Sequence, residues 1–234
     1  MELFLSCISW YAVFVLSITC HEAAHAFAAF KLGDRTAWHG GLATFDPIPH
    51  MQRSPFGMMV VPLLSFFTAG WMIGWASVPY DPYWAENYPK KAAYMALAGP
   101  AANLALVIVA GLLIHLGITI GIFHAPDSIA FTSVVETEKD GYQAGMAFMV
   151  SVLFTLNLLL LVFNLIPITP LDGTALAEFF LKGETLRKYR DSMANPNLRV
   201  FGIFIAWMFL DFIFGPVQLL ALNILYIWRG YTYG

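Results

Sequence analysis

Charged side chains are scarce in this sequence, because Asp, Glu, Lys and Arg together make up 12% of its 234 residues. An average globular domain carries about 25% of such residues, so half of the usual solubilising charge is missing. The hydrophobic share of 59% is too high for a chain that stays disordered. An ordinary soluble domain and a disordered chain are therefore both excluded.

Cysteines and clusters of basic residues are also few. The two cysteines, Cys7 and Cys20, lie in one apolar run, about 20 Å apart if that run is a helix. This separation excludes a disulfide between them. The 12 Lys and Arg residues form no basic stripe with interleaved aromatic side chains. A nucleic-acid partner is therefore not expected.

Long apolar runs are what the chain has instead, and several reach the ~18–20 residues that cross a bilayer. Three of them predict membrane-spanning helices, at 3–32, 91–116 and 142–165. The segment 199–229 is long enough for a tight helical hairpin with Gly215-Pro216 at its tip. We therefore expect an all-α polytopic membrane protein with five to six transmembrane helices. Residues 1–234 should form a single integral-membrane domain with its core over 3–181.

Glycines and prolines break the chain after the first helix. Residues 33–55 contain three prolines and several glycines, which predicts a loop with a short β-hairpin. Residues 56–77 are apolar again, but Pro62, Gly70 and Gly74 interrupt them. Such interruptions permit a re-entrant path that enters the membrane and returns on the same side.

The first apolar helix contains the motif His21-Glu22-Ala23-Ala24-His25. Residues at i and i+4 share one helix face, so both imidazoles can bind a single Zn²⁺, with Glu22 placed to take a proton from water. The alternative is that the imidazoles form hydrogen bonds to neighbouring helices and that Glu22 is protonated. The cost of polar groups within a membrane favours the functional interpretation.

A catalytic zinc site needs a third protein ligand, and Asp172 is the candidate. Most other acidic residues lie in loops or at the terminus, where solvation is their default state. Asp172 follows a span that Pro167 and Pro170 break, and Gly173 comes next. Irregular backbone at membrane depth is tolerated where it lines a site. The alternative role for Asp172 is to cap a helix that begins near Thr174.

Three motifs in this order, HEAAH, LAGPAAN and NLIPITPLDG, resemble those of the site-2 proteases, which are intramembrane zinc metalloproteases. The resemblance covers about residues 12–181 and is nearest to the short forms without PDZ or CBS domains. It implies one Zn²⁺ per chain, bound by His21, His25 and Asp172. It also implies that Glu22 is the catalytic acid and base.

The resemblance also implies that Asn164 is a catalytic polar residue that helps to hold the substrate or the developing oxyanion. It places Gly99, Pro100 and Asn103 on a core helix beside the site, with close packing as the alternative role.

The expected function is hydrolysis of a peptide bond within or near a transmembrane segment of a membrane-protein substrate. The loop 40–55 and the segment 56–77 are the candidates to receive that unwound segment as an added strand. One alternative is a membrane zincin that cleaves at the membrane surface, with Glu178 as its third ligand. The others are a non-proteolytic metal transporter and an inactive scaffold that binds transmembrane helices.

Topology tests the metal site independently of any family. If 56–77 crossed the bilayer, the first helix and the 142–165 span would end on opposite faces, separated by most of a ~30 Å core. His25 and Asp172 could not then bind one ion. If 56–77 returns, both ends share a face. Eleven of the twelve basic residues then lie on that face, opposite Lys139.

The positive-inside rule makes the crowded face cytoplasmic. We therefore expect a multi-pass protein of a prokaryotic cell membrane, with its active site toward the cytoplasm. The remaining histidines, His39, His50, His115 and His124, are expected to be solvated residues of loops or helix ends.

Overall fold

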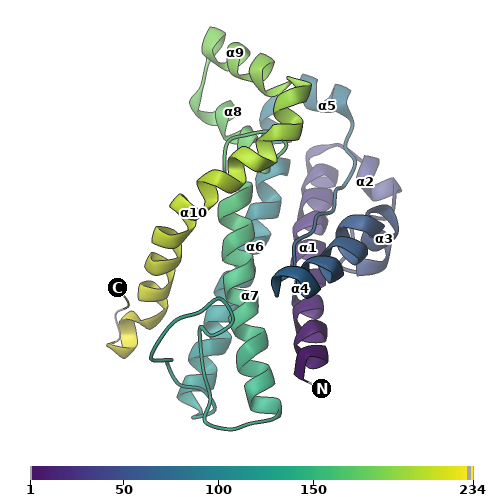
Figure 1. Cartoon of the computed structure of the whole chain (residues 1–234). Helices are drawn as coiled ribbons and strands as arrows, with labels where there is room; N and C mark the ends of the chain where they lie inside the picture. The colour runs from purple at the N-terminus through teal and green to yellow at the C-terminus, as the bar shows by residue number, and fades with distance from the viewer. Residues whose placement is uncertain (1, 231–232, 234) are drawn as a thin grey trace.

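The computed structural model describes residues 2–230 and 233, and in this part of the chain the regular structure is helical. Three long helices, α1 (Glu2–Leu32), α6 (Pro89–Thr119) and α7 (Tyr142–Asn164), form the centre of the molecule. They run side by side (Figure 1) and are long and apolar enough to cross a membrane. The three apolar runs that predict spans are thus confirmed as long helices and are candidate spans.

The first helix stops where the sequence predicts it. Gly33 has a φ of +112°, which an L side chain rarely adopts, and its N–H donates to the Ala29 carbonyl at 3.0 Å. Asp34 then accepts hydrogen bonds from the N–H and the hydroxyl of Thr36. The chain therefore leaves α1 in a tight turn directly beyond the apolar run.

The β-hairpin expected within residues 33–55 is not formed. This segment folds into two short helices, α2 (Thr36–His39) and α3 (Pro47–Arg53). The side chain of Asp46 accepts the Ile48 N–H, and Pro47 occupies the first turn of α3. An Asp cap followed by proline starts a helix, so the local signal here favours a helix over a strand.

Residues 56–77 turn back, as the re-entrant interpretation requires. A π-helical turn (Phe56–Val60) leads into α4 (Val61–Ala69), which ends at Gly70 with φ +79°. The chain then returns in an extended form, and the Trp75 N–H donates to the Gly57 carbonyl at 3.1 Å. A Cβ on Gly57 would lie 2.1 Å from the Trp75 carbonyl oxygen, so glycine is required for this close approach.

After the return comes the short helix α5 (Pro82–Asn87), which leads into α6. At the opposite end of the bundle, residues 120–141 connect α6 to α7 as an irregular loop (Figure 1). Ser151 of α7 holds this loop by accepting the N–H groups of Val134 and Val135 at 3.0 and 3.1 Å.

Beyond α7, a loop leads to a 3₁₀ turn (Asp172–Leu176), α8 (Ala177–Phe180) and the exposed helix α9 (Gly183–Met193). The last long element, α10 (Pro196–Tyr226), crosses the bundle obliquely (Figure 1). A short 3₁₀ turn (Ile227–Arg229) follows it.

The prediction of a helical hairpin at 199–229 is wrong, because α10 bends by 50° between Leu210 and Phe212 and does not reverse its direction. Pro216 explains the bend without a reversal, since a proline removes the hydrogen bond to the residue four positions earlier and crowds its carbonyl. The bent helix makes a fourth candidate span. The described residues thus hold three to four spans by length and composition, fewer than the predicted five to six.

The path of α10 also places one basic residue, Arg229, at a different end of the molecule from the predicted one. The Tyr226 hydroxyl donates to the Val134 carbonyl at 2.6 Å, so the end of α10 lies beside the 120–141 loop. Arg229 therefore lies near the Lys139 end of the molecule and away from the other ten basic residues. The predicted charge asymmetry is reduced but not reversed.

Candidate metal centre

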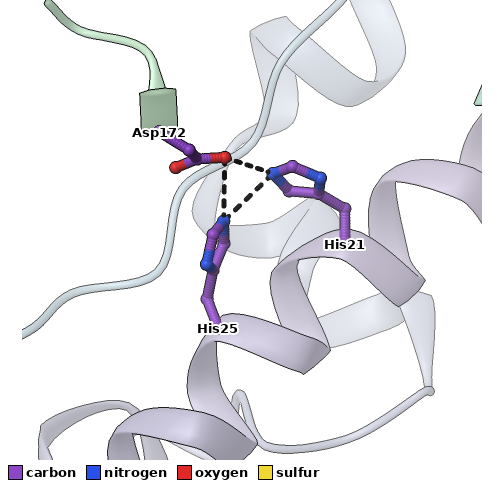
Figure 2. A group of neighbouring side chains, drawn as sticks. All are labelled: His21, His25 and Asp172. Carbon is purple, nitrogen blue, oxygen red and sulfur yellow. Dashed lines mark hydrogen bonds and ion pairs between the residues drawn. The ribbon is translucent and has the colours of Figure 1, made fainter. Parts of the chain in front are cut away.

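The side chains of His21, His25 and Asp172 converge at one point between α1 and the turn that follows α7. Both histidines lie on the same face of α1 and point toward a single carboxylate oxygen (Figure 2). His21 Nε2 and His25 Nε2 lie 3.1 Å and 3.4 Å from Asp172 Oδ2. The two Nε2 atoms are 3.0 Å apart.

This donor set fits a zinc ion. Zinc prefers imidazole nitrogen and carboxylate oxygen at about 2.0–2.2 Å in a tetrahedral arrangement, which places neighbouring ligand atoms about 3.3 Å apart. The three observed separations are close to that edge. Asp172 Oδ2 is buried and has no hydrogen-bond partner among the described residues, as expected for an atom whose partner is a metal ion.

Gly99 of α6 borders the same point. A Cβ atom at this position would lie 2.4 Å from His25 Nε2 and 2.5 Å from His21 Nε2. Any side chain there would fill the space in front of the two ligand nitrogens. The structure thus gives Gly99 of the LAGPAAN motif a definite place beside the site.

The other ring nitrogen of each histidine is also held. His25 Nδ1 lies 2.9 Å from the Met95 carbonyl oxygen, and His21 Nδ1 lies 2.7 Å from Asn103 Oδ1. Both partners belong to α6. Hydrogen bonds of this kind fix the ring orientation and leave Nε2 free as a ligand. Asn103, like Gly99, is therefore in direct contact with the predicted ligands.

Glu22 is buried, with 6% of its surface exposed, and it directly follows His21 in α1. No hydrogen bond or ion pair to another described residue engages its carboxylate. Asn164, at the end of α7, donates from Nδ2 to the Leu160 carbonyl at 3.0 Å, and the structure shows no contact between it and the three ligands. The sequence motifs thus identify the converging residues, whereas Asn164 faces its own helix.

The other acidic and histidine candidates lie elsewhere. Glu178 forms a two-point ion pair with Arg190 of α9, at 2.7 and 2.5 Å. Asp172 does not cap a helix, since its carboxylate faces the histidines and Leu171 is the cap residue of the following turn. His50, expected to be solvated, is 1% exposed, with Nε2 3.1 Å from the Thr44 carbonyl, because α3 packs it inward.

One part of the site was missed at the level of sequence. Asn157 of α7 is fully buried and lies 2.9 Å from Asn103. Its position in the middle of an apolar span is itself a signal, because polar groups within membrane helices are usually functional. No motif draws attention to it.

The chain is similar in sequence to known proteins. The profile of peptidase family M50 matches residues 9–209. YwhC of Bacillus subtilis, named as a candidate zinc metalloprotease, is 31% identical over 70% of this chain and 65% of its own. The similarly named Rip2 of Mycolicibacterium smegmatis is 31% identical over 75% of this chain and 58% of its own. Rip2 of Mycobacterium tuberculosis is 29% identical over 88% and 70%, respectively.

The chain thus spans about three fifths to two thirds of the first two of these relatives. No solved structure is significantly similar to it. The profile match covers most of the chain and includes both histidines and Asp172, which the structure brings together. The chain belongs to peptidase family M50.

Proposed function

We propose that this protein is an intramembrane zinc metalloprotease that hydrolyses a peptide bond within or near a transmembrane segment of a membrane-protein substrate. The observation that carries the proposal is the convergence of His21, His25 and Asp172 within a bundle of membrane-length helices. Glu22, next to this cluster, is the candidate base. The family and the names of the relatives agree with it.

Zinc bound by these three residues supplies the Lewis acidity that activates water and polarises a peptide carbonyl. In the proposed reaction Glu22 accepts the proton of the attacking water and delivers it to the departing amine nitrogen. His21, His25 and Asp172 hold the ion. Asn164 is proposed to contact the substrate or the developing oxyanion, which requires its amide to leave the Leu160 carbonyl.

We propose that the substrate unwinds before cleavage, because hydrogen bonds within a helix shield its carbonyl groups. The non-helical part of the loop 40–55, before α3, and the return after α4 are the proposed docking sites, where the substrate would add as a strand. Residues 72–81 form no helix and pair with no strand, which supports this assignment because their backbone groups are not used in regular structure.

The proposed orientation places the metal site near the cytoplasmic leaflet of a bacterial membrane. Ten of the twelve basic residues lie toward the end of the bundle that holds the site, which supports this orientation by the positive-inside rule. In this arrangement α1 begins outside, 56–77 enters and returns, and α10 crosses outward.

The competing functions have less support. A surface-cleaving zincin with Glu178 as its third ligand requires Glu178 to give up its ion pair with Arg190. A metal transporter does not require a base at Glu22, so a single substitution separates transport from proteolysis.

The test compares metal content and cleavage in wild type and two variants. Glu22→Gln should keep about one zinc per chain and lose cleavage of a transmembrane substrate by at least about 10³-fold, since a general base is removed. Asp172→Ala should lose most of its zinc. Wild-type proteolysis by the Glu22→Gln variant would overturn the proposal.

A further inference from the structure

A chain of buried polar side chains leads away from the metal centre into the membrane-spanning bundle. Asn103 Nδ2 donates to Asn157 Oδ1 at 2.9 Å. Asn157 Nδ2 donates to Ser17 Oγ at 2.9 Å and to the Leu153 carbonyl at 2.8 Å. Ser17 Oγ donates to the Val13 carbonyl at 2.7 Å. These three side chains come from α6, α7 and α1, and each is 0% exposed.

The direction of every hydrogen bond in this chain follows from its far end. The Leu153 carbonyl can only accept, so the atom of Asn157 that faces it must be the amide nitrogen. Ser17 uses its single hydrogen on the Val13 carbonyl, so it accepts the second hydrogen of that nitrogen. Both N–H groups of Asn157 are then in use, and its oxygen is left to accept.

The orientation passes on to Asn103. Because Asn157 presents an oxygen, Asn103 must direct its amide nitrogen toward Asn157 and its oxygen toward His21. An amide oxygen can only accept, so His21 Nδ1 carries the ring hydrogen and Nε2 keeps the lone pair that a metal ion needs. The Met95 carbonyl imposes the same tautomer on His25 directly.

We propose that Asn157 is a positioning residue that sets the tautomer of His21 through Asn103 without touching any of the three metal ligands. This inference rests on the proposed zinc site. The Leu153 carbonyl fixes the orientation of the Asn157 amide, and Asn157 in turn fixes the orientation of the Asn103 amide. The oxygen of Asn103 then determines which ring nitrogen of His21 carries the hydrogen. Without Asn157, the Asn103 amide is free to turn its nitrogen toward His21, which favours the tautomer with hydrogen on Nε2.

The test is the zinc dissociation constant of purified protein, measured by competition with a chelator. Asn157→Leu should weaken zinc binding by about 10-fold, at the lower end of what loss of an outer partner of a ligand costs. Ser17→Ala is the matched control, because it removes a buried hydrogen bond of the same chain but leaves Asn157 oriented by Leu153. Its zinc affinity should equal that of wild type.

A second substitution separates orientation from packing. Asp at position 103 has two accepting oxygens and no nitrogen to turn, so Asn103→Asp should hold the His21 tautomer whether or not Asn157 is present. Asn157→Leu should therefore cost no zinc affinity in the Asn103→Asp background. Thermal unfolding of the zinc-free proteins verifies that each variant folds.

Wild-type affinity in Asn157→Leu, or the same loss in both backgrounds, would overturn the inference. A wild-type protein that binds no zinc would instead overturn the proposed function, so the two failures are distinguishable.

Discussion

Gly99 is the residue at which the metal centre leaves least room. Its hydrogen faces both ligand nitrogens, and a methyl carbon in that place would lie 2.4 and 2.5 Å from them, well inside van der Waals contact. Neither imidazole can move far, because Met95 and Asn103 hold their outer nitrogens. A methyl group at this position would therefore clash with both imidazoles, and it would also fill the space in which the ion is expected to bind.

Gly99→Ala should lower zinc affinity by at least about 10-fold. It should not weaken α6 itself, since alanine has a higher helix propensity than glycine. Zinc content and thermal unfolding of the purified variant measure the two effects. Gly145→Ala in α7 is the matched control, because a Cβ there meets nothing within 4 Å. Full zinc binding by Gly99→Ala would show that the ion does not sit between these nitrogens.

At this scale the spacing of the motif residues predicted most of the site. His21 and His25 one turn apart, and Asp172 beyond a proline-broken span, do meet. The sequence could not predict the role of Asn157, because its importance depends on which helix faces are in contact. The same reason explains His50, whose burial comes from the packing of α3 against the rest of the chain.

The turn that carries Asp172 is held by elements outside the central bundle of α1, α6 and α7. Tyr189 of α9 donates its hydroxyl to the Pro167 carbonyl at 2.9 Å, and Arg190 pairs with Glu178. On another side, α10 approaches so closely that a Cβ on Gly202 would lie 1.9 Å from the Thr169 carbonyl oxygen. Contacts on both sides of Asp172 therefore fix a segment that has little regular structure of its own.

Arg190→Gln should weaken zinc binding by about two- to fivefold, the range of a partly exposed ion pair, because the Asp172 turn loses one support. Chelator competition measures this change. Lys188→Gln is the control, since it breaks an exposed ion pair to Glu184 on the same helix that supports nothing near the site. An equal effect of both substitutions would rule out the bracing role of Arg190.

Asp34 links the end of α1 to the segment before α5. Burial alone would raise the pKa of this carboxyl, but hydrogen bonds from the hydroxyl and N–H of Thr36 and the N–H of Asp81 hold it below its ordinary value. A lowered carboxyl pKa stabilises the fold above the unfolded value of about 3.9, and this contribution is lost as the pH falls below it.

Asp34→Asn should therefore reduce the melting temperature at pH 6 and have a smaller effect at pH 3. The melting temperature of wild type and variant in detergent micelles, measured at both values, tests this prediction. An equal difference at the two pH values would mean that the charge of Asp34 contributes nothing to stability.

The elements themselves were predictable where one strong signal dominated. Uninterrupted apolar runs gave α1, α6 and α7, and the glycines of 56–77 gave a returning segment. Two predictions failed because local signals compete. Asp46-Pro47 starts a helix where a hairpin was expected, and Gly215-Pro216 bends α10 instead of reversing it, since proline within a long apolar helix removes only one hydrogen bond.

In the whole molecule, the C-terminal ends of α1 and α7 lie on one face. This is possible because residues 56–77 fold back. Single cysteines, introduced after Cys7 and Cys20 are replaced by serine, can test this topology in intact cells. Cysteines introduced at positions 54, 80 and 188 should react with an impermeant thiol reagent only after the cells are opened. A cysteine at Lys139 should react from outside. Labelling of positions 54 and 80 from opposite sides would contradict the re-entrant path.

The central claim is that His21, His25 and Asp172 bind one zinc ion between them. X-ray absorption at the zinc edge, on the purified wild type and the Asp172→Ala variant, tests it most directly. Wild type should contain about one zinc per chain with nitrogen and oxygen neighbours at about 2.0–2.2 Å, and the variant should lose most of the metal. A sulfur neighbour at about 2.3 Å, or an unchanged spectrum and zinc content in the variant, would contradict the claim.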